Sequence, residues 1–192
     1  MGKRLFDVVA ATLGLLVLSP VFLMISLAVK LSGPGPVFFR QERIGRRFQP
    51  FTILKFRSMR PGSEGPPLTV RGDERITAVG RLLRRTKLDE LPQLWNVLKG
   101  EMSLVGPRPE VRSYVEMFRN DYEEILTLRP GITDQASVEF RDEEVRLAQS
   151  ADPDALYRSE ILPRKIRLAK DYVRTRNGWS DFLLLLRTVL HL

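Results

Sequence analysis

The first thirty residues constrain the fold more than any other part of the chain. Residues 5–29 are almost wholly apolar, and a Ser19-Pro20 pair interrupts them near the middle. A run of roughly 20 apolar residues is long enough to cross a membrane as a helix. Pro20, however, lacks an N–H and crowds the Leu16 carbonyl, and Ser19 can bond back to Leu15 and help bend the helix. Each arm alone is only about 15 to 20 Å long, too short to span.

Basic residues flank this apolar segment on both sides. Lys3 and Arg4 precede it, and further cations follow it: Lys30, Arg40, Arg43, Arg46 and Arg47. Because Lys and Arg favour the cytoplasmic side of a membrane, both ends are expected on the same side. A re-entrant hairpin satisfies this, and a kinked span is an equal alternative from the residues alone. Asp7 is costly in the segment unless it lies at the interface or pairs with Lys3 or Arg4.

The charge balance calls for an anionic partner. The chain has 192 residues, a formal net charge of +8 and a pI near 10.2. Nucleic acid, an anionic membrane surface or a phosphorylated substrate would each match this charge. Without cysteine there is no disulfide or thiol chemistry. The single histidine, His191, argues against catalytic zinc and is expected to be an ordinary helix-end residue.

The segment after the apolar run predicts a turn and a β-hairpin. Residues 32–36 break any helix, and residues 37–43 and 51–59 have the composition of two strands joined by a basic turn. In the second strand Lys55 and Arg57 fall on the same face. A solvated strand face is the simple interpretation of these two cations.

A loop and a basic helix are expected next. Residues 60–74 are rich in proline and glycine, which indicates either a mobile flap near a site or a connector. Residues 76–85 predict a short helix that carries Arg84 and Arg85. Such a run of charge is usually a solvated helix face.

Residues 88–110, with the sequence LDELPQLWNVLKGEMSLVGPRPE, begin with a predicted helix. Asp89 suits the N-cap, with Pro92 in the first turn and apolar residues at three- and four-residue spacing after it. Gly100 suits the left-handed position after the helix. A competing register begins at Thr86, but it places Pro92 in the helix interior.

The same segment carries groups suited to phosphate chemistry. Asp89 and Glu90 are adjacent carboxylates, and Arg108 lies between two prolines that stiffen the backbone presenting its planar guanidinium. A helix N-terminus and Arg84 are expected to keep Asp89 ionised, and an ionised aspartate can attack phosphorus. Mg²⁺ would offset the repulsion between carboxylate and diphosphate. The alternative is a helix cap with a dipole-favoured neighbour.

This segment resembles the core of the bacterial sugar transferase family, the small monotopic phosphoglycosyl transferases. The similarity extends to KRLFD near the N-terminus, Ser19-Pro20, KFRSM at residues 55–59 and RPGIT at residues 129–133. The resemblance therefore covers most of the chain, and its long central motif is highly specific.

The resemblance implies an α+β, mainly helical fold with a short β-hairpin and interfacial amphipathic helices. Residues 1–31 would form a re-entrant membrane helix broken at Ser19-Pro20, with Lys3 and Arg4 at its start. Residues 32–192 would form a cytosolic catalytic domain at the cytoplasmic face of the bacterial inner membrane. Anionic lipids would be partners of its surface helices.

The resemblance also implies an activity. Sugar-1-phosphate would pass from a UDP-sugar to a polyprenol phosphate, releasing UMP through an aspartyl phospho-sugar. Asp89 would be the nucleophile and the contact to Mg²⁺, with Glu90 as its dyad partner in a role left open. The substrate phosphates would be bound by the family's cations: Lys55, Arg84 and Arg108.

The C-terminal half is expected to be helical, with one departure from the family pattern. Residues 110–128 predict one or two helices, Pro163 begins another, and residues 179–192 predict an apolar-rich helix that either lies on lipid or packs on the domain. Where many relatives continue RPGITG, this chain has a different segment at 134–144, expected to be a loop that selects nucleotide or sugar.

Two other functions compete with transfer. A membrane-tethered basic adaptor explains the charge but not Asp89 and Arg108, and no nucleic-acid motif is present, so no nucleic-acid partner is expected. A glycosidase needs opposed carboxylates, which adjacent Asp89 and Glu90 do not supply. The residues do not specify the sugar, the glycan or the oligomeric state.

Overall fold

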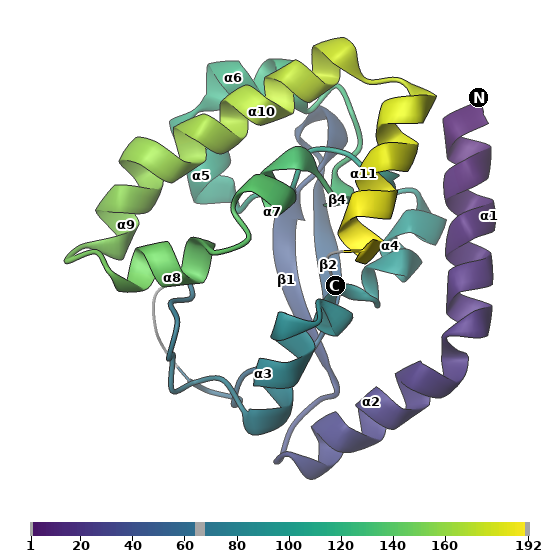
Figure 1. The fold of residues 1–192 in the computed structure, drawn as a ribbon, viewed down its shortest axis with the longest axis vertical. Helices are drawn as coiled ribbons and strands as arrows, with labels where there is room; N and C mark the ends of the chain where they lie inside the picture. Colours follow the sequence, from purple (N-terminus) through teal and green to yellow (C-terminus); the bar gives the residue numbers. More distant parts are fainter. Residues whose placement is uncertain (1, 64–67, 191–192) are drawn as a thin grey trace.

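The computed structural model describes residues 2–63 and 68–190, and it is a mainly helical α+β structure (Figure 1). His191 lies outside the described residues. The strands are β1 (Phe38–Ile44), β2 (Pro50–Phe56), β3 (Ser103–Val105) and β4 (Gly131–Thr133). The helices are α1 (Gly2–Val17), α2 (Ser19–Leu31), α3 (Ala78–Arg85), α4 (Gln93–Lys99), α5 (Arg112–Met117), α6 (Arg119–Ile125), α7 (Gln135–Glu139), α8 (Glu143–Ala148), α9 (Pro153–Leu156), α10 (Leu162–Thr175) and α11 (Gly178–Leu190), with short 3-10 or π turns η1 (Arg46–Phe48), η2 (Leu88–Glu90) and η3 (Tyr157–Ile161).

The apolar N-terminal segment is a bent pair of helices. α1 and α2 meet at Ser19-Pro20 with a bend of 62°. Pro20 cannot donate to the Leu16 carbonyl, and the Ser19 hydroxyl donates to it instead at 2.8 Å. The expected bond from Ser19 to Leu15 is therefore wrong by one residue. In the described chain no single helix has the length and apolarity of a membrane span, whereas the bent pair meets that criterion together.

Polar contacts attach α1 to the rest of the molecule. Asp7 is buried and accepts hydrogen bonds from the Ser103 hydroxyl at 2.8 Å and the Leu104 N–H at 3.1 Å. Of the two alternatives considered for Asp7, pairing with Lys3 or Arg4 is not found, because those cations have other partners. Arg4 donates to the Val97 and Leu98 carbonyls near the end of α4, and Lys3 pairs with Asp181 of α11. α1 is thus fixed against β3, α4 and α11.

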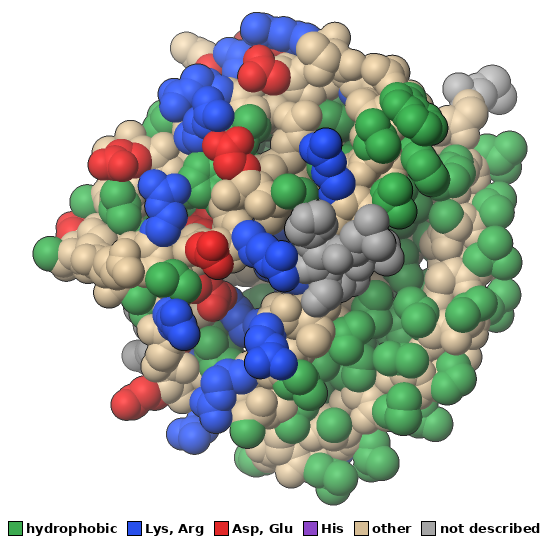
Figure 2. Space-filling model, viewed as in Figure 1, with side chains coloured by type: hydrophobic (Ala, Val, Ile, Leu, Met, Phe, Trp, Pro, Cys, Tyr) green, Lys and Arg blue, Asp and Glu red, His purple; other side chains and the backbone are tan. Residues whose placement is uncertain are grey.

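The remaining surface of the bent pair is apolar and exposed. Figure 2 shows hydrophobic side chains gathered along the side of the molecule formed by α1 and α2, with charged side chains gathered on the opposite side. The exposed large apolar residues of this pair are Leu5, Phe6, Val9, Leu13, Leu16, Val17, Leu23, Met24, Leu27 and Leu31. α11 adds Trp179, Phe182 and Leu186, while its Leu184 is buried. α11 therefore has one packed face and one exposed apolar face.

The predicted β-hairpin is present, and its second strand leads into the charged region of the molecule. β1 and β2 are antiparallel, with Phe39 opposite Lys55. The expectation that Lys55 and Arg57 share one strand face fails, because β2 ends before Arg57. Arg57 is buried and donates to the Val29, Gly33 and Pro34 carbonyls, at the end of α2 and just after it. Lys55 turns elsewhere, toward Glu90.

A small parallel strand pair sets the backbone next to Arg108. β3 pairs with β4 through Ser103–Gly131 and Val105–Thr133. A Cβ on Gly106 would lie 2.6 Å from the Arg129 carbonyl oxygen, and one on Gly131 would lie 2.1 Å from the Gly106 nitrogen. Only glycine permits this approach. The GPRP and RPGIT motifs are therefore two sides of one backbone contact.

The helical predictions for the C-terminal half are largely confirmed. α5 and α6 fill residues 110–128, and α10 and α11 follow in the expected places. The expected loop at 134–144 is wrong: most of it is helical, in α7 and the start of α8. Asp134 accepts from the Ser137 N–H at 2.8 Å, which is an N-cap that begins α7.

We expect Asp7→Ala to lower the free energy of unfolding by about 2 kcal/mol, because it leaves a buried hydroxyl and a buried N–H without an acceptor. Thermal unfolding in detergent measures the change. Thr12→Ala is the matched control, since Thr12 bonds only within α1 to the Val8 carbonyl and is exposed there. Equal, small shifts for both variants would contradict the role of Asp7 in attaching α1.

Candidate active site

Asp89 and Glu90 lie in a 3-10 turn, and neither caps a helix. Lys87 has a left-handed conformation with φ of 56°, and η2 follows it directly. α4 begins at Gln93 with Pro92 at its N-cap and no capping side chain. The predicted cap at Asp89 and the alternative cap at Thr86 are therefore both wrong. The end of α4 agrees with prediction, because Gly100 adopts the left-handed conformation.

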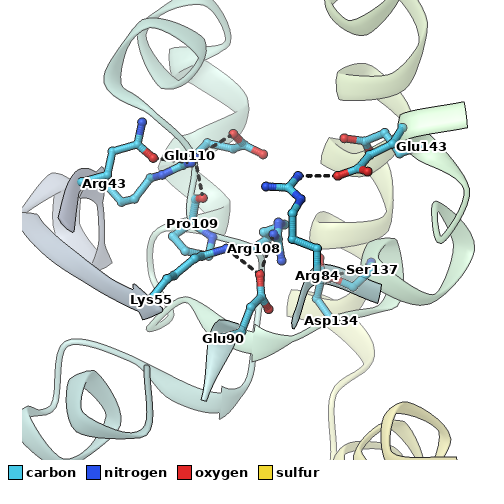
Figure 3. Close-up of polar contacts among 12 residues, drawn as sticks. Arg43, Lys55, Arg84, Glu90, Arg108, Pro109, Glu110, Asp134, Ser137 and Glu143 are labelled. Carbon is cyan, nitrogen blue, oxygen red and sulfur yellow. Dashed lines mark hydrogen bonds and ion pairs between the residues drawn. The ribbon is translucent and has the colours of Figure 1, made fainter. Parts of the chain in front are cut away.

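Glu90 is shared by two cations from distant parts of the chain. Its Oε1 accepts from the Lys55 Nζ at 2.6 Å and from the Arg108 Nη2 at 3.0 Å. Lys55 comes from β2 and Arg108 from the segment after β3, and Figure 3 shows both side chains converging on Glu90. The side chain of Glu90 is almost fully buried. One carboxylate oxygen is thus shared by two cations.

The two adjacent carboxyl groups have opposite pKa shifts. Burial opposes ionisation of Glu90, but Lys55 and Arg108 outweigh it and hold its pKa below the ordinary value. Burial raises the pKa of Asp89, and the neighbouring Glu90 raises it further, against the attraction of Lys55 and Arg84. The surroundings of Asp89 were expected to favour its ionised form, but burial has the opposite effect on its pKa.

Arg84 is turned toward α8. Its Nη2 donates to Glu144, and Figure 3 shows the guanidinium pointing toward the acidic end of that helix. It has no hydrogen bond with Asp89, although its charge lowers the pKa of that carboxyl. Arg84 therefore acts on Asp89 through its charge and not through a hydrogen bond. Its direct partner, Glu144, was not predicted from the sequence.

One large cleft contains all five residues singled out by the sequence. It has a volume of about 1530 Å³, and its lining includes Lys55, Arg84, Asp89, Glu90 and Arg108. Typical small-molecule sites measure roughly 300 to 1000 Å³, so this cleft has room for more than one drug-sized ligand. The lining also includes parts of α7 and α8, which bound the cleft on the side of Arg84.

A second buried network lies beside Arg108 and was missed in the sequence. Glu110 accepts from the Tyr157 hydroxyl at 3.0 Å and pairs with Arg43 at 3.5 Å, and its backbone carbonyl accepts from the Ile44 N–H. Burial lowers the pKa of Arg43, and burial together with Glu110 raises that of Tyr157. This network ties β1 and η3 to the segment that presents Arg108. Its members are far apart in sequence, and no local pattern joins them.

The donor set fits one kind of metal ion. Within residues 2–63 and 68–190, no group of three or more His, Cys, Asp or Glu side chains could hold a metal. Mg²⁺ does not need such a cage, because one or two carboxylates and substrate phosphates often suffice. Asp89 lines the cleft, and its Oδ1 is buried without a hydrogen-bond partner in the described structure. Asp89 therefore fits a Mg²⁺ shared with a bound phosphate.

Comparison with known proteins gives a consistent result. The family model described as "Bacterial sugar transferase" matches residues 1–192. A Caulobacter vibrioides protein named UDP-glucose:undecaprenyl-phosphate glucose-1-phosphate transferase is 41% identical over 194 residues, or 98% of this chain and 68% of its own length. An Escherichia coli protein of the same name is 41% identical over 97% of this chain. An Aeromonas hydrophila UDP-N-acetylgalactosamine-undecaprenyl-phosphate N-acetylgalactosaminephosphotransferase is 38% identical, again over 97%. The chain spans only 39% and 42% of the last two proteins.

We expect Asp89→Asn to raise the melting temperature at pH 7 without Mg²⁺, and Glu90→Gln to lower it. The folded-state pKa of Asp89 lies above its unfolded value, so its ionisation opposes folding at any pH above the unfolded value. The folded-state pKa of Glu90 lies below its unfolded value, so its negative charge stabilises the fold at neutral pH. That stabilisation is lost as the pH falls through the folded-state pKa. Glu90→Gln should cost about 2 kcal/mol.

Thermal unfolding of the two variants in detergent with EDTA measures these shifts. Glu116→Gln is the control, because its ion pair with Arg119 is exposed and should contribute under about 1 kcal/mol. Shifts of the same sign for Asp89→Asn and Glu90→Gln would contradict the opposite electrostatic surroundings of the two carboxyl groups.

Proposed function

The chain belongs to the bacterial sugar transferase family, and we propose that it transfers a sugar-1-phosphate from a UDP-sugar to a polyprenol phosphate, releasing UMP. Undecaprenyl phosphate is the proposed acceptor, since the names of the similar proteins specify it. The observation that carries the proposal is the cleft itself. It combines a buried, unpartnered carboxyl oxygen on Asp89 with the cations Lys55, Arg84 and Arg108.

In the first half-reaction Asp89 is the nucleophile. A carboxylate oxygen attacks the phosphorus that bears the sugar, and the bond from that phosphorus to the UMP oxygen breaks. UMP leaves with the bonding electron pair, and the sugar phosphate remains on Asp89. Burial supports this role, because a carboxylate that its surroundings stabilise poorly is more basic and more reactive.

The cations bind and orient the diphosphate. Arg108 is presented from stiff backbone and can bind phosphate oxygens in a bidentate manner, while Lys55 supplies a point charge. Glu90 is a positioning residue, because it holds both cations through a single oxygen. Mg²⁺, held by Asp89 and the substrate phosphates, would neutralise charge on the diphosphate when bound.

In the second half-reaction a phosphate oxygen of the polyprenol phosphate attacks the same phosphorus. The bond to Asp89 breaks, the carboxylate is restored, and polyprenyl-diphospho-sugar is released. This would be the first membrane step in assembling a glycoconjugate. The sugar is left open, because the named relatives use different ones.

The acceptor's lipid chain requires that the cleft lie close to a membrane. We propose that α1 and α2 form a re-entrant hairpin in the inner membrane, with residues 32–192 as a catalytic domain on the cytoplasmic face. Support comes from the exposed apolar residues of both helices, the bend of 62°, and the basic flanks. α11 would lie on anionic lipid through its exposed apolar face, which begins at Trp179.

We expect purified protein with Mg²⁺ and undecaprenyl phosphate to release UMP from UDP-glucose or UDP-N-acetylgalactosamine. Asp89→Asn should lower turnover by about a thousandfold or more, because it removes the attacking group. Arg108→Gln should lower kcat/KM roughly a hundredfold by removing a charge-assisted contact to phosphate. EDTA should abolish turnover.

Arg112→Gln is the control for lost positive charge, since Arg112 forms an exposed pair with Glu42 and neither residue lines the cleft. It should leave turnover unchanged. No UMP release from any UDP-sugar, with binding to anionic vesicles retained, would favour the adaptor alternative. Ordinary turnover by Asp89→Asn would refute the assignment of the nucleophile.

For membrane topology, we expect both ends of the chain on the same side. Because the chain contains no cysteine, a single-cysteine tag can be added at Met1 or at Leu192. Both tags should resist a membrane-impermeant maleimide in intact cells and react after lysis. Reaction of the Met1 tag alone in intact cells would indicate a spanning helix.

A further inference from the structure

α8 is held across the cleft by contacts to separate parts of the chain. Glu144 pairs with Arg84 of α3, and Glu143 pairs with Lys165 of α10. The Glu144 carbonyl also accepts from the Arg71 N–H at 2.9 Å. The acidic end of α8 therefore closes one side of the cleft through its two glutamates.

The Glu144 carboxylate is paired with Arg84, one of the cations proposed to bind the diphosphate. Lys55 and Arg108 share the single carboxylate of Glu90, whereas Arg84 is paired one to one with Glu144. Arg84 lines the same cleft as Asp89. We propose that Glu144 is a substrate-displaced counterion, which holds Arg84 until the diphosphate of the nucleotide sugar replaces it. This proposal rests on the function proposed above and adds a residue that sets substrate affinity.

Of the two ion pairs that hold α8, the one between Arg84 and Glu144 is the easier to break. The Glu144 side chain is 43% exposed and that of Arg84 is 25% exposed, so water screens their attraction. The pair between Lys165 and Glu143 is less exposed, at 11% and 23%. A diphosphate carries more negative charge than one carboxylate and can accept from both arms of the guanidinium. Glu144 can therefore be displaced while Glu143 keeps α8 in place.

The test measures binding of inorganic pyrophosphate with Mg²⁺ to the full-length protein by isothermal titration calorimetry. Glu144→Gln should tighten binding roughly two- to fivefold, the range expected when a partly exposed ion pair no longer competes. Glu144→Ala, which also removes the charge, should give a similar gain. Glu139→Gln is the control, because its pair with Arg164 is exposed and lies outside the cleft lining. It should leave affinity unchanged.

A double-variant cycle separates counterion competition from a general effect of charge. In an Arg84→Gln background, Glu144→Gln should give no gain in pyrophosphate affinity, because the competing pair no longer exists. With UDP-sugar as substrate, Glu144→Gln alone should lower KM by a similar factor. Unchanged or weaker pyrophosphate binding by Glu144→Gln would overturn the proposal, as would an equal gain in the Arg84→Gln background.

Failure of this proposal is distinguishable from failure of the proposed function. The calorimetric measurement does not require turnover, so it reports on Glu144 even if no sugar phosphate is transferred. Turnover of the unaltered chain tests the proposed function separately. A wild-type chain that turns over a UDP-sugar, with Glu144 variants that bind pyrophosphate no tighter, would overturn only the counterion role.

Discussion

The site depends on one oxygen atom shared by two cations. Glu90 Oε1 accepts from Lys55 and from Arg108, and these contacts join the β-hairpin, the 3-10 turn η2 and the segment after β3. Removing Glu90 would leave two partly buried cations without their shared carboxylate, which is strongly unfavourable. Because one carboxylate serves two cations, it holds both of them at the same point of the cleft.

The same turn places two neighbouring carboxyl groups in opposite electrostatic surroundings. Glu90 is ionised and held in place by its cations, while Asp89 is buried with an oxygen that has no partner in the described structure. A structural cap would satisfy its oxygens with backbone N–H groups, and Asp89 caps no helix. An under-stabilised carboxylate facing a positively charged cleft is the arrangement expected of a nucleophile. On this account Glu90 supports the chemistry through Lys55 and Arg108, and Asp89 performs it.

Sequence reasoning succeeded where a local rule was sufficient. Proline chemistry predicted the bend at Ser19-Pro20, glycine predicted the end of α4, and residue chemistry singled out Asp89 and Arg108, which line one cleft. Lys55, which lines the same cleft, was identified through the family resemblance. It failed where tertiary contacts override local preference. Asp89 is a good N-cap residue, yet the left-handed Lys87 places it in a separate turn. The partners of Asp7, Arg84 and Glu110 come from segments that no local pattern connects, and the close contact of Gly106 with Gly131 became evident only in three dimensions.

The central claim is that Asp89 carries the sugar phosphate during transfer. Intact-protein mass spectrometry tests it most directly, after the protein is mixed with Mg²⁺ and a UDP-sugar that it turns over, without lipid acceptor, and quenched. The account predicts an added mass of one sugar phosphate, which peptide mapping assigns to Asp89 and which undecaprenyl phosphate removes. An adduct on a different residue, an adduct that persists in Asp89→Asn, or turnover with no adduct under any quench would contradict it.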